Sequence, residues 1–66
     1  MNIDYNVMGL YAGWRDGFYN HPFKGFVNPS NWTELQNSEF WKGYERGFVQ
    51  GKADAEDADP AGQTVN

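Results

Sequence analysis

The side chains of this sequence that could take part in acid–base chemistry are His21, Asp16 and Glu45. A catalytic carboxylate needs surroundings that shift its pKa, and the helical pattern described below predicts that Asp16 and Glu45 lie on polar helix faces in contact with water. His21 could act as a general base, but no serine or cysteine nucleophile has a visible place beside it. A histidine followed by proline is more typical of a surface turn. We therefore expect no catalytic residue and predict that the protein is not an enzyme.

No cofactor or metal site is expected either. The chain has 66 residues, no cysteine and one histidine, which excludes thiolate sites and multi-histidine metal centres. Its glycines recur every fourth residue along predicted helices, and this spacing does not direct consecutive N–H groups at an anion as a phosphate-binding loop does. Roughly 50 ordered residues also leave little room for a substrate pocket of a few hundred Å³. Binding to another molecule is the remaining functional class.

The first predicted helix spans about residues 4–19. Its apolar side chains recur at helical spacing: Val7, Leu10, Tyr11, Trp14 and Phe18. Asp4 is the expected N-cap. Asn20 and Pro22 are expected to end the helix, because the residue before a proline avoids the helical region of backbone space.

The second predicted helix spans about residues 38–53. Its aromatic side chains lie on one side: Phe40, Trp41, Tyr44 and Phe48. Asn37 or Ser38 is the expected N-cap, and Glu39 suits the positive end of the helix dipole. Residues 20–37 are predicted to be irregular, apart from a short helical turn that Pro29 opens and that runs through Trp32 and Leu35.

Each predicted helix carries three glycines spaced four residues apart. They are Gly9, Gly13 and Gly17 and, 34 residues later, Gly43, Gly47 and Gly51. A glycine inside a helix costs about 1 kcal/mol relative to alanine, so a close approach of two helices is the expected compensation. Bulky side chains lie on the same side of both stripes: Val7, Leu10 and Trp14, and Trp41, Tyr44 and Phe48.

The sequence thus predicts an all-α fold of two helices packed through glycine stripes, either within one chain as a helical hairpin or across a homodimer. The glycines are predicted to be structural, together with Trp14, Trp41, Tyr44 and Phe48. A transmembrane glycine zipper is excluded by the charged residues within the two segments, Arg15, Asp16, Glu45 and Arg46. An array of tetratricopeptide repeats shares the 34-residue period, but two units are too few and the aromatic positions differ.

The net charge of −4 comes entirely from the C-terminal part of the chain, where the excess acids are Asp54, Glu56, Asp57 and Asp59. We expect residues 1–53 to form one helical domain and residues 54–66 to form an acidic tail that is frayed or without fixed structure. The alternative is that the second helix runs one turn into the tail, because Ala53 and Ala55 favour helix. No apolar run approaches the roughly 20 residues that span a bilayer, and the polar start does not resemble a signal peptide. A cytoplasmic location in a bacterial host cell is the expectation.

Candidate binding residues come from the aromatic and basic side chains. Twelve aromatic residues are many for so small a core, and those most expected at the surface as interface anchors are Tyr11, Tyr19, Phe26 and Trp32. The alternative is that these four cap the core from the middle segment. Arg15, Lys42 and Arg46 could contact phosphates, although a dedicated nucleic-acid binder carries a clear basic excess and this chain does not.

Three short motifs follow one another along the chain: Ala12-Gly13 with Gly17, then His21-Pro22-Phe23, then Trp41-Lys42-Gly43-Tyr44-Glu45. This order resembles the ribosome modulation factor family of small bacterial proteins, over about residues 9–48. The resemblance implies two short helices and binding to the small ribosomal subunit, with promotion of inactive ribosome dimers. This chain departs from the family in its acidic rather than basic ends, in His21 where the family turn has cysteine, and in a longer insertion before the second helix.

We therefore predict a non-catalytic binding protein that occupies a surface of a bacterial ribosome or other nucleoprotein machine and modulates or inhibits it. The alternative is a phage-encoded inhibitor of a host defence complex, of the anti-CRISPR type, that acts through protein–protein contacts. An enzyme that modifies a small molecule is a third and weaker option. The expected partner is a ribosome, RNA or a host protein complex rather than a membrane, and homodimerisation stays open.

Overall fold

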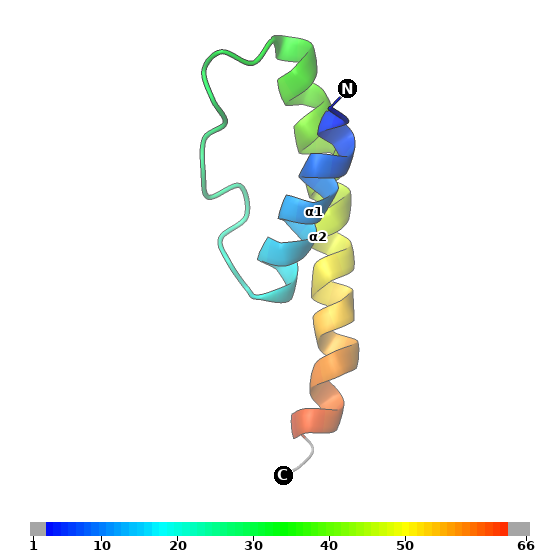
Figure 1. The fold of residues 1–66 in the computed structure, drawn as a ribbon. Helices are drawn as coiled ribbons and strands as arrows, with labels where there is room; N and C mark the ends of the chain where they lie inside the picture. The colour runs from blue at the N-terminus through cyan, green and yellow to red at the C-terminus, as the bar shows by residue number, and fades with distance from the viewer. Residues whose placement is uncertain (1–2, 64–66) are drawn as a thin grey trace.

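The computed structural model describes residues 3–63, and for residues 59–63 it describes the backbone alone. Helix α1 (Tyr5–Phe18) and helix α2 (Glu34–Gln63) pack along each other, and no strand occurs among the described residues. The predicted all-α helical hairpin is therefore confirmed. Its two arms run in the same direction, because the connecting segment, residues 19–33, returns from the end of α1 to the start of α2 along one side of the pair (Figure 1).

Side chains cap the N-terminal ends of both helices. The Asp4 carboxylate accepts hydrogen bonds from two backbone N–H groups of the first turn of α1, at 3.1 and 3.2 Å, as predicted. In α2 the cap is Thr33: its Oγ1 accepts from the Gln36 N–H at 3.1 Å, and the Gln36 Oε1 accepts from the Thr33 N–H at 2.8 Å. The prediction of Asn37 or Ser38 as the cap was wrong, because this reciprocal capping box satisfies two N–H groups one turn earlier.

The chain leaves α1 through a left-handed residue. Asn20 has φ 61°, a conformation that asparagine tolerates better than most residues. The N–H of His21 then donates to the carbonyl oxygen of Asp16, five residues earlier, at 2.8 Å. This is the 6→1 hydrogen bond of a Schellman motif. Further along, the predicted turn after Asn28 is reduced to one hydrogen bond, from the Trp32 N–H to the Pro29 carbonyl at 3.2 Å.

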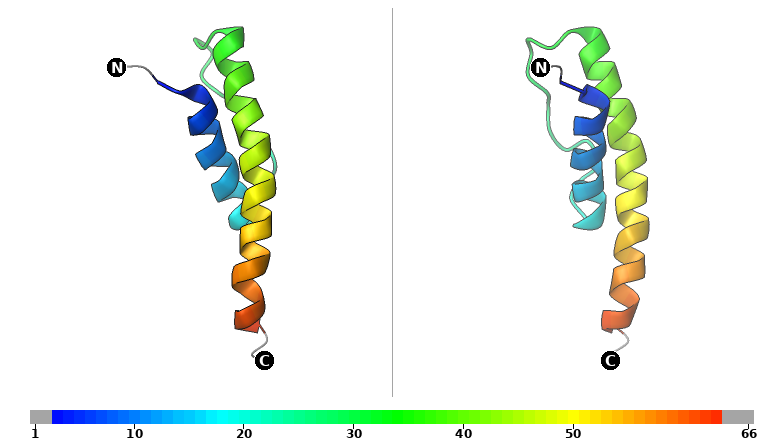
Figure 2. Two further views of the ribbon diagram at one scale, coloured as in Figure 1. Left: turned by 90° about the vertical axis from the view of Figure 1, so that its right-hand side faces the viewer. Right: turned by 45° about the vertical axis from the view of Figure 1, so that its right-hand side comes forward.

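Helix α2 continues well beyond the end of α1 (Figure 2). Residues 54–63, expected to be part of a tail without fixed structure, are helical, and the remaining residues 64–66 lie outside the described residues. The physical reason is that a packed helix has already been nucleated, so further residues other than Pro60, which has no N–H, add hydrogen bonds without a new nucleation cost, and alanines support its extension. Within the described part of the chain, neither helix is long and apolar enough to cross a membrane.

The glycine stripes form the contact between the helices, which we call the glycine seam: Gly9, Gly13, Gly17, Gly43, Gly47 and Gly51. All six are buried. A methyl group added to any of them would overlap a backbone carbonyl oxygen of the other helix; at Gly13, for example, this oxygen belongs to Tyr44. The α-hydrogen that occupies this position instead points at the carbonyl, which is the arrangement of a Cα–H···O contact. The predicted packing through glycine is confirmed.

The seam has an internal two-fold character. Gly13 faces the carbonyl of Tyr44, and Gly47 faces the carbonyl of Leu10. Adding 34 to the residue numbers converts Gly13 into Gly47 and Leu10 into Tyr44, so the contacts of one helix map onto those of the other. The same relation holds for the other two glycine pairs. Two helices related in this way present two equivalent grooves, one on each side of the seam.

Candidate functional site

The two sides of the helix pair are covered differently. On one side, which we call the covered side, the aromatic rings of the connecting segment pack onto α2. Phe23 lies 4.8 Å from Phe48 between ring centroids, Phe26 lies 5.4 Å from Trp41, and Trp32 packs edge-to-face against Phe40 at 5.4 Å. Edge-to-face aromatic pairs of this kind add to the free energy gained from burial. The connecting segment therefore covers the buried side chains Phe40 and Tyr44 of α2, while Phe23 remains 50% and Phe26 37% exposed.

A buried carboxylate ties the connecting segment to both helices. Asp16 of α1 is only 3% exposed, and its Oδ2 accepts a hydrogen bond from the hydroxyl of Tyr44 at 2.6 Å. Its Oδ1 lies 3.0 Å from Nδ1 of His21 and 3.4 Å from the Arg15 guanidinium. The Tyr44 hydroxyl in turn accepts from the backbone N–H of Lys24 at 2.9 Å. The expectation that Asp16 is solvated was wrong, because Asp16 lies beside the seam on the covered side.

Burial and hydrogen bonding together determine the protonation states of Asp16 and Tyr44. Burial acts to raise the pKa of Asp16, but the hydrogen bonds from Tyr44 and His21 and the charge of Arg15 outweigh it, so the pKa of Asp16 lies below its usual range. Burial and the hydrogen bond to Asp16 both raise the pKa of Tyr44. Asp16 is thus held as a carboxylate and Tyr44 as a neutral phenol. Every buried side-chain nitrogen and oxygen among the described residues has a partner.

The geometry of this network favours a structural role over a catalytic one. Tyr44 is completely buried, and its hydroxyl is occupied by a donor and an acceptor within the protein. His21 is half exposed, but its nearest partner is the buried Asp16 rather than a nucleophile. In the described part of the chain, no three histidine, aspartate or glutamate side chains gather as metal ligands would. The arrangement holds the connecting segment against the helices.

The opposite side of the seam, which we call the open side, contains a groove that no described segment of the chain fills. Leu10, Tyr11 and Trp14 of α1 and Gln50 of α2 line it, and its volume is about 410 Å³. The indole N–H of Trp14 donates to the Asp54 carboxylate at 2.7 Å, and this hydrogen bond together with one from Gln50 lowers the pKa of Asp54. Trp14 is therefore fixed in orientation while its ring borders the groove.

The outward surfaces of the two helices also differ. On α1 the exposed side chains are mainly apolar: Val7, Met8, Tyr11 and, just after the helix, Tyr19. Tyr11 is 72% exposed, although it lies on a regular helix. On α2 the exposed charged side chains Lys42, Glu45, Arg46 and Lys52 stand beside two exposed apolar ones, Leu35 and Val49. An apolar outward face on an ordered helix is typical of a surface that another molecule covers.

The seven predicted binding residues separate into two groups. Tyr11, Tyr19, Arg15, Lys42 and Arg46 are exposed. Arg46 donates to the side-chain oxygen of Asn6 at 3.1 Å across the open side, and Lys42 lies 3.6 Å from Glu39. Phe26 and Trp32 pack on aromatic rings of the covered side, Phe26 with 37% of its surface still exposed. The position of these two side chains agrees with the alternative stated above, in which they cap the core from the middle segment.

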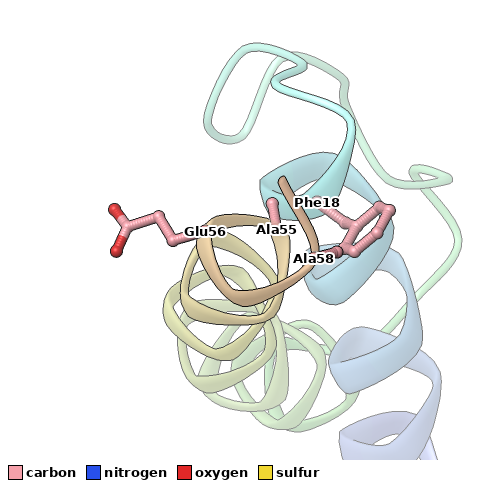
Figure 3. A pocket seen from close by; sticks show the side chains of 4 residues that line it. All are labelled: Phe18, Ala55, Glu56 and Ala58. Atoms are coloured by element: carbon pink, nitrogen blue, oxygen red, sulfur yellow. The ribbon is translucent and has the colours of Figure 1, made fainter. Parts of the chain in front are cut away.

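Figure 3 shows a further hollow, at the C-terminal end of α1. Phe18 of α1 lines it together with Ala55, Glu56 and Ala58 of α2, and its volume is about 470 Å³. The carboxylate of Glu56 points away from the ring of Phe18 (Figure 3). The alanines leave the hollow shallow and without a convergent set of polar groups, so it offers little to fix the orientation of a ligand.

Two functional features of the site were missed by sequence reasoning. The burial of Asp16 had a signal: it directly precedes Gly17 of the seam and lies three residues after Gly13, and thus at the edge of the stripe. The position of Gln50 beside the open groove also had a signal, because the 34-residue offset makes Gln50 the equivalent of Asp16. Neither signal identifies a contact until the direction of the second helix is known.

Comparison with known proteins adds no relative: no protein-family model, no curated protein and no solved structure matches this chain.

Proposed function

We propose that this chain is a non-catalytic binding protein that occupies a surface of a bacterial ribosome or another nucleoprotein machine and thereby modulates or inhibits it. The observation that supports this proposal is the outward face of α1. Tyr11 and Val7 stand exposed there on a helix whose position is fixed by the glycine seam. Rigid aromatic side chains are frequent anchors of macromolecular interfaces, because little conformational entropy is lost when they are buried.

Exposed basic side chains on both helices favour a partner that contains nucleic acid. Arg15 lies on α1 with its side chain 57% exposed, and Lys42 on α2 is 67% exposed. Such side chains contact phosphates, while exposed tyrosines stack on unpaired bases or pack on protein. The resemblance to the ribosome modulation factor family also supports the proposal, since its glycines (Gly13, Gly17 and Gly43) belong to the seam that supports the face.

A second candidate function rests on the extension of α2. The exposed acids Glu56 and Asp57 lie on helical backbone beyond the end of α1. A helix that projects negative charge fits a basic protein groove, as an inhibitor of the anti-CRISPR type would require. This alternative places the partner contact on α2, whereas the principal proposal places it on α1.

The test is a pull-down from bacterial lysate with the full chain as bait, before and after nuclease treatment. The principal proposal expects capture of ribosomal subunits or another nucleoprotein particle, loss of that capture with Tyr11→Ser, and a steep decline in binding as salt is raised. The matched control is Val49→Ser on α2, because Val49 is 69% exposed and Tyr11 is 72% exposed.

The outcomes separate the two candidates. Capture of a protein complex that resists nuclease, is lost with Glu56→Gln and Asp57→Asn together, and is unaffected by Tyr11→Ser would replace the principal proposal with the inhibitor. Capture that survives all these substitutions would exclude both contact surfaces.

A further inference from the structure

We propose that the open groove binds an extended segment of a partner protein that carries two aromatic side chains three residues apart. This proposal deepens the proposed function, on which it rests, by naming the part of the partner that α1 recognises. The groove lies beside the seam, between Leu10 and Trp14 of α1 and Gln50 of α2. Its volume of about 410 Å³ is in the range that holds a few side chains.

The evidence for the occupant is the filled groove on the covered side. The internal two-fold relation places Leu10 where α2 has Tyr44, and Trp14 where α2 has Phe48. In the filled groove, the ring of Phe23 lies 5.6 Å from Tyr44 and 4.8 Å from Phe48. The protein thus shows on its own covered side what kind of group this groove accepts, namely an aromatic ring from a segment without regular structure.

The spacing of the expected aromatic pair follows from the same comparison. Three residues after Phe23, the ring of Phe26 lies 5.4 Å from Trp41 and 5.7 Å from Tyr44. The equivalents of Trp41 and Tyr44 on the open side are Val7 and Leu10. A partner segment with aromatic residues at i and i+3, running opposite to α1, would place its rings in the same two positions.

The polar side chains beside the two grooves differ, which affects how each groove can hold a segment. At the position equivalent to Asp16, the open side has Gln50, whose amide can both donate to and accept from a peptide backbone. The rim on α2 carries Arg46, which lies against Asn6 of α1. The Asp54 carboxylate accepts hydrogen bonds from Trp14 and Gln50 beside this groove. The open groove therefore suits a segment held by its rings and backbone, whereas the covered side holds its segment through Asp16.

A second copy of this chain is the competing occupant, and its size argues against it. A helix of 14 residues is about 21 Å long and about 10 Å wide, so the open side with the face of α1 offers a few hundred Å². A stable homodimer interface uses about 800 Å² on each partner. Two aromatic side chains of a peptide segment bury about 300–500 Å², which the open side can supply.

The experiment is selection from a phage-displayed library of random 12-residue peptides on the immobilised full chain, followed by titration of a selected synthetic peptide. We expect enrichment of sequences with two aromatic residues at i and i+3. In ¹⁵N NMR spectra of the protein, the peptide should shift the indole N–H signal of Trp14 and leave those of Trp32 and Trp41 in place. The Trp14 signal is assigned as the one missing from the Trp14→Phe variant.

Two neighbouring substitutions provide the matched control. Gln50→Trp places an indole at the rim of the groove and should weaken binding of the selected peptide at least tenfold. Val49→Trp places the same group on the outward face of α2, and should leave the affinity unchanged. Both residues are exposed, so neither variant is expected to unfold.

Three outcomes would overturn the inference. The first is the absence of an enriched aromatic pair. The second is selected peptides that bind Gln50→Trp as well as the original chain. The third is a monomer–dimer equilibrium in sedimentation at micromolar concentration that Gln50→Trp abolishes, which would assign the groove to a second copy. Nucleoprotein capture that depends on Tyr11, without any peptide selection, would retain the proposed function and exclude this deeper proposal.

Discussion

The covered and open sides of the helix pair start from the same geometry and end in different roles. The seam presents equivalent grooves on both sides, because its contacts repeat with an offset of 34 residues. On the covered side α2 contributes Tyr44, which is completely buried, and the connecting segment fills the groove. On the open side α1 contributes Leu10 and the groove is empty. The seam therefore fixes the backbone, and the side chains beside it decide whether a groove stabilises the fold or can bind a partner.

The largest expected effect comes from breaking the seam that both sides share. Gly13→Leu and Gly47→Leu each place a side chain against a backbone carbonyl of the other helix. Overpacking against backbone should cost more than about 3 kcal/mol, and a domain of this length has about 3–9 kcal/mol in total. Both variants should lose cooperative thermal unfolding, measured by circular dichroism at 222 nm.

The comparison also predicts that the two glycine variants behave alike, since Gly13 and Gly47 are equivalent positions. Gly25→Ala is the control outside the seam, where an added Cβ would meet the Pro22 side chain at 3.0 Å, and it should unfold cooperatively. If either leucine variant melted at the original temperature, the seam could not be the contact that defines the two grooves.

The next largest loss of stability should come from a substitution on the covered side. Tyr44→Phe leaves the buried Asp16 without its 2.6 Å hydrogen bond and the Lys24 N–H without its acceptor. Loss of a hydrogen bond to a buried charged group costs about 2 kcal/mol. Urea unfolding should show this loss as a lower midpoint with an unchanged slope.

Tyr11→Phe is the same chemical change on the open side. The hydroxyl of Tyr11 belongs to a side chain that is 72% exposed, so its removal should change stability by less than about 0.5 kcal/mol. Equal losses for Tyr44→Phe and Tyr11→Phe would contradict the assignment of the covered side as the stabilising one.

The pH dependence of stability should also come from the covered side. The pKa of Asp16 is lowered in the folded protein, so below the unfolded value of about 4 the unfolded chain binds a proton before the folded chain does. Stability should therefore decrease as the pH falls from about 4 through the folded pKa. The pKa of Tyr44 is raised, so stability should also decrease as the pH rises above about 10.

Two variants separate these contributions from those of other ionisable groups. Asp16→Asn should flatten the acid limb of a plot of unfolding free energy against pH, and Tyr44→Phe should flatten the alkaline limb. An acid limb with the same slope in Asp16→Asn and in the original chain would mean that other carboxylates carry the dependence.

Much of the fold was predictable because the signals were local or repeated. The glycine stripes, the aromatic spacing and the Asp4 cap each depend on residues within two turns of one another. The start of α2 was missed although Thr33 and Gln36 have the spacing of a capping box, because the aromatic pattern begins later. The relative direction of the helices could not be predicted, since equal stripes pack in parallel or antiparallel order.

The division into a covered and an open side was not predictable for the same reason. Phe26 and Trp32 were as well suited to an interface as Tyr11 when only their residue types were known. Their packing against α2 depends on the return path of the connecting segment, which follows from the parallel direction of the helices. The burial of Asp16 depends on this path as well, since His21 and Lys24 belong to that segment.

The smallest expected effect on stability belongs to the open side and tests its assignment as the binding side. Tyr11→Ser removes an aromatic ring that is 72% exposed, and Val49→Ser removes an apolar side chain that is 69% exposed. Neither should change the free energy of unfolding by more than about 0.5 kcal/mol, measured by urea titration. Of the two variants, Tyr11→Ser alone should abolish capture of the nucleoprotein partner from lysate, because Tyr11 lines the open groove and Val49 does not. Loss of capture in both variants would place the binding surface across both helices, and loss in neither would leave the apolar face of α1 without the role that its exposure suggests.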